Sequence, residues 1–219
     1  LNYGKLRASW AQVGNDADPY LLRSYYRKTD IAGGFGNTTF PFNGVPGYTV
    51  DNQIGNSDLK PEITTAFEVG TELNFFENRL SVDFSYYRNR SKDQILPVPI
   101  APGTGYAFKV LNTGLVENKG VELSLRGTPI RTASGFTLEL YGTYTKNDNT
   151  VLDIAGGVDQ VVLGGVSGMS IVAAKGRPYG TFYAQDVQRD PQGRVIISPE
   201  DGMPLLTDGA VYLGSYNPD

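Results

Sequence analysis

One stretch of alternating residues constrains the fold of this chain more than any other. From residue 61 to residue 76, apolar or threonine side chains alternate almost without fault with charged, amide or small ones. A period of two is the pattern of a β-strand, whose successive side chains point to opposite faces. The stretch is sixteen residues long, whereas strands of soluble sheets average about five or six. This length favours a strand that crosses a membrane at a tilt, which needs roughly 9–11 residues for the lipid alone.

Four further segments alternate in the same way and are expected to join this strand in one sheet. The five predicted strands cover residues 3–13, 61–76, 80–91, 113–129 and 136–147. Long connections at residues 14–59, 92–112 and 149–219 alternate with two short turns. Short turns at one end and long loops at the other are typical of outer-membrane barrels. The predicted fold class is therefore all-β: a segment of an antiparallel transmembrane β-barrel, incomplete as a barrel, with long outer loops.

The composition excludes several classes of function. The chain has 219 residues and contains neither histidine nor cysteine, so Ser-His-Asp, Cys-His and His-based zinc mechanisms are impossible within it. Its 19 basic and 23 acidic residues give a net charge of −4, whereas nucleic-acid binding needs clustered basic residues. These exclusions leave carboxylate chemistry open; our expectation is nevertheless that the chain is not an enzyme and has no cofactor, no metal and no nucleic-acid partner. An apolar run of about 18 residues, which a transmembrane helix requires, is also missing from the sequence.

Periodicity alone leaves open which environment each strand face meets. In a soluble β-sandwich the apolar face is the core, whereas in a membrane barrel it faces lipid and the polar face lines the lumen. Strand length and the rhythm of the connections favour the barrel. A soluble glycan-binding sandwich, such as a lectin or adhesin module, remains the alternative, and a β-rich glycan hydrolase is a second one.

In a barrel, the polar strand faces supply the candidate lumen residues. These are Glu68, Glu72, Asp83, Glu122, Arg126 and Glu139. Two carboxylates flanking a sugar linkage would suit a glycosidase, but nothing in the pattern selects two of these acids. Polar side chains are the default lining of a hydrated lumen, so we expect no catalytic residue among them.

The first long connection is rich in aromatic residues that could contact a ligand. They include Tyr20, Tyr25, Tyr26, Phe40 and Tyr48. Flat rings beside Asn and Asp suit the faces and hydroxyls of sugars, because they combine apolar stacking with hydrogen bonding. The alternative is that each ring packs within its own loop.

Some aromatic and glycine residues have a structural interpretation. Trp10, Tyr86, Tyr87 and Tyr144 are expected in the aromatic girdle at the membrane interface. Gly120 is expected to permit a bend or bulge where a loop enters the wall.

Five motifs, in order, give the chain a resemblance to a known family. They are KLRASWAQVGN at 5–15, LKPE at 59–62, FFENRLSVDFSYYRNRSKDQIL at 75–96, NKGVE at 118–122 and KGRPYGTFY at 175–183. In this order and spacing they resemble the C-terminal half of TonB-dependent outer-membrane receptors, above all the SusC/RagA type of nutrient importer.

This resemblance implies a location and a set of partners. The protein would lie in the cell outer membrane, in contact with its lipid, and import a nutrient, an oligosaccharide or a peptide. A SusD-like surface lipoprotein would cover the barrel. The family's plug domain has no counterpart among these 219 residues, so TonB would act through a plug region outside them, and the chain is expected to be a fragment.

Overall fold

We describe the chain from a computed structural model, in which the described residues are 1–28, 31–33, 36–154 and 158–215. The predicted outer loops at 14–59 and 149–219 thus include some residues outside the described part of the chain: 29–30, 34–35, 155–157 and 216–219. The chain divides into two compact units. The first comprises Leu1–Val13, Ile63–Lys92 and Gly114–Asp219, and the second comprises Gly14–Glu62 and Asp93–Thr113.

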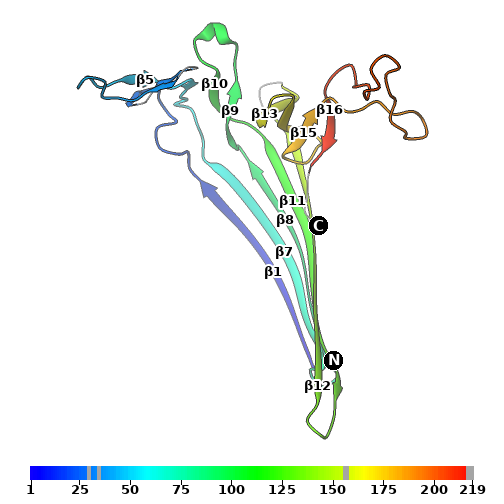
Figure 1. Ribbon diagram of the computed structural model, residues 1–219. Coiled ribbons are helices and arrows are strands. Elements are labelled where there is room, and N and C mark those ends of the chain that lie inside the picture. The colour runs from blue at the N-terminus through cyan, green and yellow to red at the C-terminus, as the bar shows by residue number, and fades with distance from the viewer. Residues whose placement is uncertain (29–30, 34–35, 155–157, 216–219) are drawn as a thin grey trace. The chain divides into compact units, whose positions relative to one another are not determined.

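A five-stranded sheet is the main element of the first unit (Figure 1). Its order is β1-β7-β8-β11-β12, and the pairs from β7 to β12 are antiparallel. The bounds are β1 Tyr3–Asn15, β7 Glu62–Phe75, β8 Leu80–Lys92, β11 Leu115–Arg131 and β12 Thr137–Asp153. Successive long strands are thus neighbours in the sheet, which is the up-and-down order of a barrel wall. The all-β, antiparallel fold class is confirmed for this sheet.

Two short turns connect the strands at one end of the sheet. Between β7 and β8, Arg79 N donates to Phe76 O at 3.1 Å, and Phe76, Glu77 and Asn78 all have positive φ. This backbone conformation is uncommon for residues other than glycine, and here the Glu77 N–H is bound by the side-chain oxygen of Asn2 at 2.8 Å. Between β11 and β12, Thr132 N donates to Phe136 O at 2.9 Å.

The strand register sorts the side chains by character. Directly paired residues share a face of a sheet, and Val69 pairs with Tyr86, whereas Glu72 pairs with Asp83. One face, here called the apolar face, includes Phe67, Val69, Leu73, Val82, Phe84, Tyr86, Val121, Leu123, Leu125, Leu140 and Tyr144. The other, here called the polar face, includes Glu68, Glu72, Asp83, Ser85, Tyr87, Glu122, Arg126 and Glu139.

β12 is longer than the sequence pattern predicts. Its alternation fades near residue 147, yet its pairing with β11 continues to Asp153. Side-chain amides explain the extension. Asn149 Nδ2 donates to Asn118 Oδ1 at 2.6 Å, and Asn149 Oδ1 accepts a hydrogen bond from Tyr179 N at 2.7 Å. Polar bonds, rather than an apolar period, therefore extend the ladder past the predicted end.

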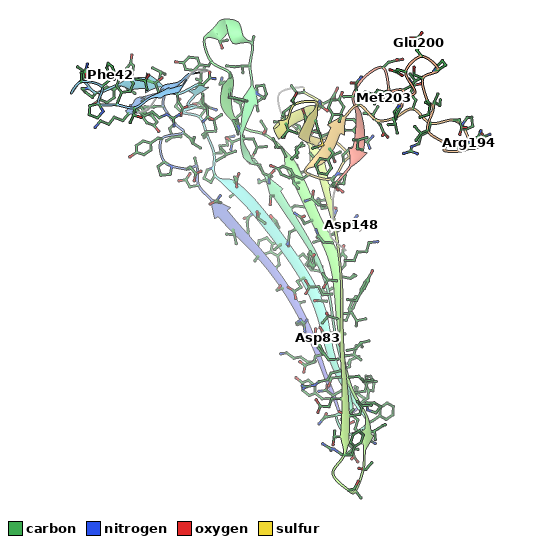
Figure 2. All side chains as sticks on the ribbon, in the orientation of Figure 1. Phe42, Asp83, Asp148, Arg194, Glu200 and Met203 are labelled. Carbon is green, nitrogen blue, oxygen red and sulfur yellow. The ribbon has the colours of Figure 1, made fainter. Side chains whose placement is uncertain are left out.

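A four-stranded sheet follows β12 in the first unit. Its order is β13-β14-β15-β16, with β13 Gln160–Val166, β14 Met169–Ala174, β15 Thr181–Ala184 and β16 Val211–Gly214. Here lie well-buried apolar side chains, with Val161 and Val172 packed out of solvent. The residues between β15 and β16 form a long arm closed by the bridges Arg189↔Val195 and Ile197↔Pro204, along which Figure 2 labels Arg194, Glu200 and Met203.

The second unit is built from short strands. They are β2 Tyr26–Lys28, β3 Ile31–Gly33, β4 Gly36–Thr38, β5 Tyr48–Val50, β6 Gln53–Ile54, β9 Ile95–Pro99 and β10 Phe108–Asn112, with one 3-10 turn, η1 Pro102–Thr104. β2 pairs with β5, β3 with β4, and β6, β10 and β9 form a third sheet. The β6–β10 pair is parallel and is not part of the five-stranded antiparallel sheet. Among the described residues, no helix is long and apolar enough to cross a membrane.

Side chains fasten the backbone of the second unit. Asn112 Oδ1 accepts a hydrogen bond from Lys60 N at 2.8 Å, while its Nδ2 donates to Lys60 O at 2.7 Å and to Asp93 O at 2.8 Å. The Glu62 carboxylate accepts from Ile95 N at 2.8 Å. Loops that lack a ladder satisfy their backbone groups with such side-chain partners.

Candidate functional site

Arg7 joins three strands on the polar face. Its Nη2 and Nη1 donate to the two carboxylate oxygens of Asp83 at 2.7 and 3.1 Å, and its Nε lies 3.6 Å from Glu68 Oε1. These residues stand on β1, β8 and β7, respectively. The guanidinium passes over Gly70, where an added Cβ would come within 2.6 Å of Arg7 Nε. A two-point arginine–carboxylate pair fixes orientation as well as distance, so the cluster ties the edge strand β1 across β7 to β8.

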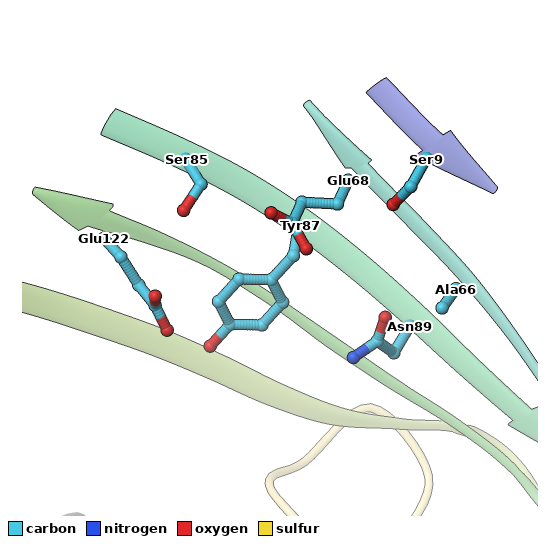
Figure 3. Close-up of a pocket in the computed structure, with 7 residues that line it drawn as sticks. All are labelled: Ser9, Ala66, Glu68, Ser85, Tyr87, Asn89 and Glu122. Atoms are coloured by element: carbon cyan, nitrogen blue, oxygen red, sulfur yellow. The ribbon is translucent and has the colours of Figure 1, made fainter. Parts of the chain in front are cut away.

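A hollow of about 350 Å³ opens on the polar face beside this cluster. Figure 3 shows the Tyr87 ring at its centre, with Glu68 on one side and Glu122 on the other. Its lining residues are Ser9, Ala66, Glu68, Ser85, Tyr87, Asn89 and Glu122. An aromatic ring between carboxylates, with hydroxyl and amide groups nearby, can combine stacking with directional hydrogen bonds. It suits a ligand with many hydroxyl or amide groups.

The Tyr87 ring lies over Gly120 of the neighbouring strand. An added Cβ at Gly120 would come within 2.5 Å of the Tyr87 hydroxyl oxygen, and this hydroxyl donates to Asn147 Oδ1 on β12 at 2.9 Å. The register runs without a shift through Gly120, so the predicted bulge there is wrong. The placement of Tyr87 in the lipid-side girdle is also wrong, because its side chain shares the polar face with Glu68.

The structure brings the six predicted polar residues together on one face. Glu68 and Asp83 belong to the Arg7 cluster, and Glu72 lies directly opposite Asp83. Glu122 borders the hollow. Arg126 and Glu139 form an exposed ion pair at 3.4 Å. That this face lines a lumen remains a prediction.

The five predicted loop aromatics belong to the second unit. Tyr20 and Tyr25 pack against each other, with ring centroids 5.1 Å apart, which favours packing within the loop for that pair. Tyr26 and Tyr48 are 74% and 61% exposed, and they share one face of the β2–β5 pair. Phe40 covers Gly47, where an added Cβ would meet its ring at 2.5 Å. Tyr26 and Tyr48 are therefore the better placed to contact a ligand.

Arg7 and Tyr87 are the residues of this candidate site that sequence reasoning misses. Arg7 belongs to the polar side of its strand, but its partner Asp83 is 76 residues away, and no local pattern reveals that pairing. Tyr87 follows Tyr86 directly, and only the alternation assigns the two rings to opposite faces. Within the described residues, His, Cys, Asp and Glu side chains nowhere gather in a group able to hold a metal.

These features define a class of protein first. Long antiparallel strands in chain order, short turns at one end, an exposed apolar face and a hollowed polar face are those of a transmembrane β-barrel wall. Comparison with known proteins then gives the family. The family model described as "TonB dependent receptor-like, beta-barrel" matches residues 2–191. The chain belongs to this family, as the motifs predicted.

Individual relatives agree with this assignment. The chain is similar to TonB-dependent receptor P26 of Formosa agariphila, with 33% identity over 98% of this chain and 23% of that protein. It is also similar to TonB-dependent receptor SusC of Bacteroides thetaiotaomicron, with 30% identity over 71% of this chain and 15% of that protein. The chain thus spans about a quarter or less of these relatives' length.

A solved structure supports the fold alone. The structure of the RagAB peptide transporter matches 96% of this chain and 23% of its own, with a TM-score of 0.69 and 21% identity. Barrels of the TonB-dependent receptor family are outer-membrane proteins, so the chain belongs to that membrane. The relatives are receptors and transporters rather than enzymes, which confirms the expectation of a non-enzyme. The soluble glycan-binding sandwich is not favoured by these matches.

Proposed function

We propose that this chain forms part of the wall of an importer that carries a nutrient, an oligosaccharide or a peptide, across the outer membrane. The apolar face would meet lipid and the polar face would line the lumen. TonB would supply the drive through a plug region outside this chain, and a SusD-like surface lipoprotein would cover the outer end. The long connections, in the second unit and after β12, would be outer loops.

One observation carries this proposal: a single sheet has an exposed apolar face and a hollowed, charged one. Leu125, Leu140 and Tyr144 are all exposed on the apolar face. Large exposed apolar surfaces need a partner or lipid to cover them. On the other face, the Arg7 cluster and the Tyr87 hollow offer charge and hydrogen bonds that only a hydrated space can accommodate. A barrel wall is the arrangement that satisfies both.

The cargo class follows from the chemistry of the polar groups. The hollow presents Glu68, Glu122 and the Tyr87 ring, and the second unit presents the Tyr26 and Tyr48 rings. Acceptor oxygens beside flat rings suit sugar hydroxyls and peptide N–H groups alike. The chain is also similar to the RagAB peptide transporter in fold, and this is consistent with a peptide as one of the two proposed cargo classes.

The orientation of the faces can be tested on the full-length receptor in lipid. Single cysteines carrying a fluorescent label are placed at Val69, Leu73, Val82 and Leu123, or at Glu68, Glu72, Asp83 and Glu122. We expect the first set to respond to a lipid-soluble quencher and the second to an aqueous one. The reverse pattern would refute the barrel orientation.

Uptake tests the cargo. Cells with the intact receptor are compared with a deletion strain for uptake of labelled oligosaccharides and peptides, with and without TonB. We expect uptake of one class that needs both proteins. The double change Tyr26→Ser and Tyr48→Ser should reduce it, whereas Phe76→Ser at a short turn should not. TonB-independent uptake, or none of either class, would contradict the proposed function.

A further inference from the structure

The apolar face changes character along its strands. Starting beside the short turns, its rows are Phe75–Leu80–Gly127–Leu140, Leu73–Val82–Leu125–Gly142, Thr71–Phe84–Leu123–Tyr144 and Val69–Tyr86–Val121–Lys146. These four rows hold one charged residue, Lys146, in the last row. The next two rows are Phe67–Arg88–Lys119–Asp148 and Thr65–Arg90–Glu117–Thr150, and they hold five. Asp148 is labelled in Figure 2, towards the far end of β12.

The charged rows are dominated by basic side chains. Five basic side chains, here called the basic band, are exposed on this face: Arg88, Arg90 and Lys119 in these two rows, Lys146 in the row before them, and Lys92 in the row after them, Ile63–Lys92–Leu115–Asp153. Glu117, Asp148 and Asp153 lie in the same rows. Five positive and three negative charges leave a local net charge of +2, whereas the whole chain has a net charge of −4. The band is thus a local feature that opposes the chain's overall charge.

Glu117 organises the two arginines. Its Oε2 accepts from Arg90 Nε at 2.6 Å and from Arg88 Nε at 2.9 Å, and it lies 2.8 Å from Arg88 Nη2 in an ion pair. The Glu117 side chain is only 8% exposed, whereas the arginine side chains are 43% and 47% exposed. One buried carboxylate therefore holds two guanidinium groups side by side. Each guanidinium has five N–H donors, so donors are left for an outside partner.

The partner must be amphiphilic. Along β12 and the residue that precedes it, every second residue from Phe136 to Tyr144 is apolar or glycine, a run of nine residues, and roughly 9–11 residues suffice for a tilted strand to cross the hydrocarbon. Lys146 is the next residue on the same face. A ligand that reaches both the apolar rows and the basic band needs an acyl chain and an anionic group. Phosphate suits such a band, because arginine binds it at two points and lysine as a point charge.

We infer that the basic band binds the phosphate groups of membrane lipids at the level where the apolar face ends. This inference rests on the proposed orientation, in which the apolar face meets lipid. Basic residues at a membrane surface attract anionic lipid, each by about 1 kcal/mol. The band would fix the depth of the wall in the bilayer and retain specific lipids on its outside, while the polar face handles the cargo.

The test uses the full-length receptor and native mass spectrometry. The protein is stripped of lipid in detergent and titrated with phosphatidylglycerol. We expect the double change Lys119→Gln and Lys146→Gln to weaken retention roughly 10- to 30-fold, the product of two such basic contributions. These lysines have no ion pair with a described residue, so their loss leaves no buried charge. The control is Lys60→Gln with Lys109→Gln, two exposed lysines of the second unit, which should bind like the parent.

Each result of this experiment decides the inference. Equal retention by the parent and the Lys119/Lys146 variant would overturn it. Displacement of the lipid by inorganic phosphate alone would also overturn it, because the ligand would then be a free anion. The fluorescent labels at Val69 and Val82 separate the two proposals. If a lipid-soluble quencher reaches the labels but the Lys119/Lys146 variant retains phosphatidylglycerol like the parent, the inference on the basic band is wrong and the barrel orientation stands. If the aqueous quencher reaches these labels, both the barrel orientation and the inference on the basic band are wrong.

Discussion

The five-stranded sheet and the second unit are each stabilised internally by a different kind of interaction: backbone ladders in the sheet, and side-chain-to-backbone hydrogen bonds in the second unit. In the sheet, the β8–β11 ladder pairs residues without interruption from Leu115↔Lys92 to Gly127↔Leu80. In the second unit the strands have two to five residues, and single amides such as Asn112 bind the backbone of several segments. A continuous backbone ladder distributes stability over many small contributions, whereas hydrogen bonds from a few side chains to the backbone concentrate it at a few positions. The sheet should therefore be destabilised most by a larger side chain at a tightly packed position, and the second unit by the loss of single side-chain hydrogen bonds.

The largest expected effect is the destabilisation of the sheet by a larger side chain at Gly120. In the variant Gly120→Ala, the new Cβ would lie within 2.5 Å of the Tyr87 hydroxyl and also against the Lys146 carbonyl, so the ring or the strands must move. We expect the full-length receptor to lose about 1–3 kcal/mol of unfolding free energy, the usual cost of overpacking, measured by urea denaturation in detergent.

A glycine of the same sheet provides the control. Nothing lies within 4 Å of a Cβ added at Gly142, so Gly142→Ala should leave the denaturation midpoint unchanged or raise it slightly. If the two alanine variants unfold at the same urea concentration, the contact of Tyr87 with Gly120 does not limit the packing of the sheet, and the contrast with the second unit weakens.

The next effect is local and belongs to the second unit. Asn112→Ala removes three hydrogen bonds, two to Lys60 and one to Asp93. Each typically contributes about 1 kcal/mol, and the backbone groups left behind are close to solvent. We expect faster amide hydrogen exchange around residues 58–62 and 93–95, with protection in β8 and β11 unchanged.

Thr38→Ala, at an exposed position of the same unit, is the matched control for Asn112→Ala and should leave exchange at residues 58–62 as in the parent. A uniform rise in exchange across β8 and β11 would show that the second unit and the sheet unfold together. The sheet and the second unit would then unfold as one cooperative unit rather than be stabilised separately.

The same contrast explains what the sequence can predict. The period of two in β7 is visible because each second side chain meets one environment along the whole strand, so the strand and its two faces follow from the pattern. The polar-face residues Glu68 and Asp83 follow with it. The extension of β12 does not, because it depends on the bonds from Asn149 to Asn118 and Tyr179, which join residues distant in sequence.

Contacts between strands explain the remaining differences. Arg7 reaches Asp83 only through the strand order, and Gly120 accommodates Tyr87 only because the register places them opposite each other. A single strand contains neither fact. The parallel β6–β10 pair involves two residues on each side, which is too short for any period to show. Sequence reasoning thus finds the faces of the wall, and register decides which residues meet on them.

The smallest expected effect depends on pH and lies in the arm between β15 and β16. Asp190 closes a turn in which Gly193 N donates to Asp190 O at 2.9 Å, and its carboxylate accepts from Arg194 N and Gln192 N, both at 2.9 Å. The backbone hydrogen bond from Arg194, followed by its side chain and the Gln192 N–H, holds the pKa of Asp190 below its usual value. A carboxylate with a lowered pKa stabilises the folded turn above its unfolded pKa of about 3.9.

This stabilisation should therefore be complete at neutral pH and disappear as the pH falls through the lowered pKa of Asp190. We expect the Gln192 and Arg194 amides to exchange faster, after correction for the intrinsic rate, as the pH falls below about 4, while β8 amides stay protected. Asp190→Asn keeps an acceptor oxygen but has no titrating group, so its turn should show no such dependence. If the pH response persists in Asp190→Asn, another group titrates. The hydrogen bonds of the Asp190 carboxylate would then not be what stabilises this turn.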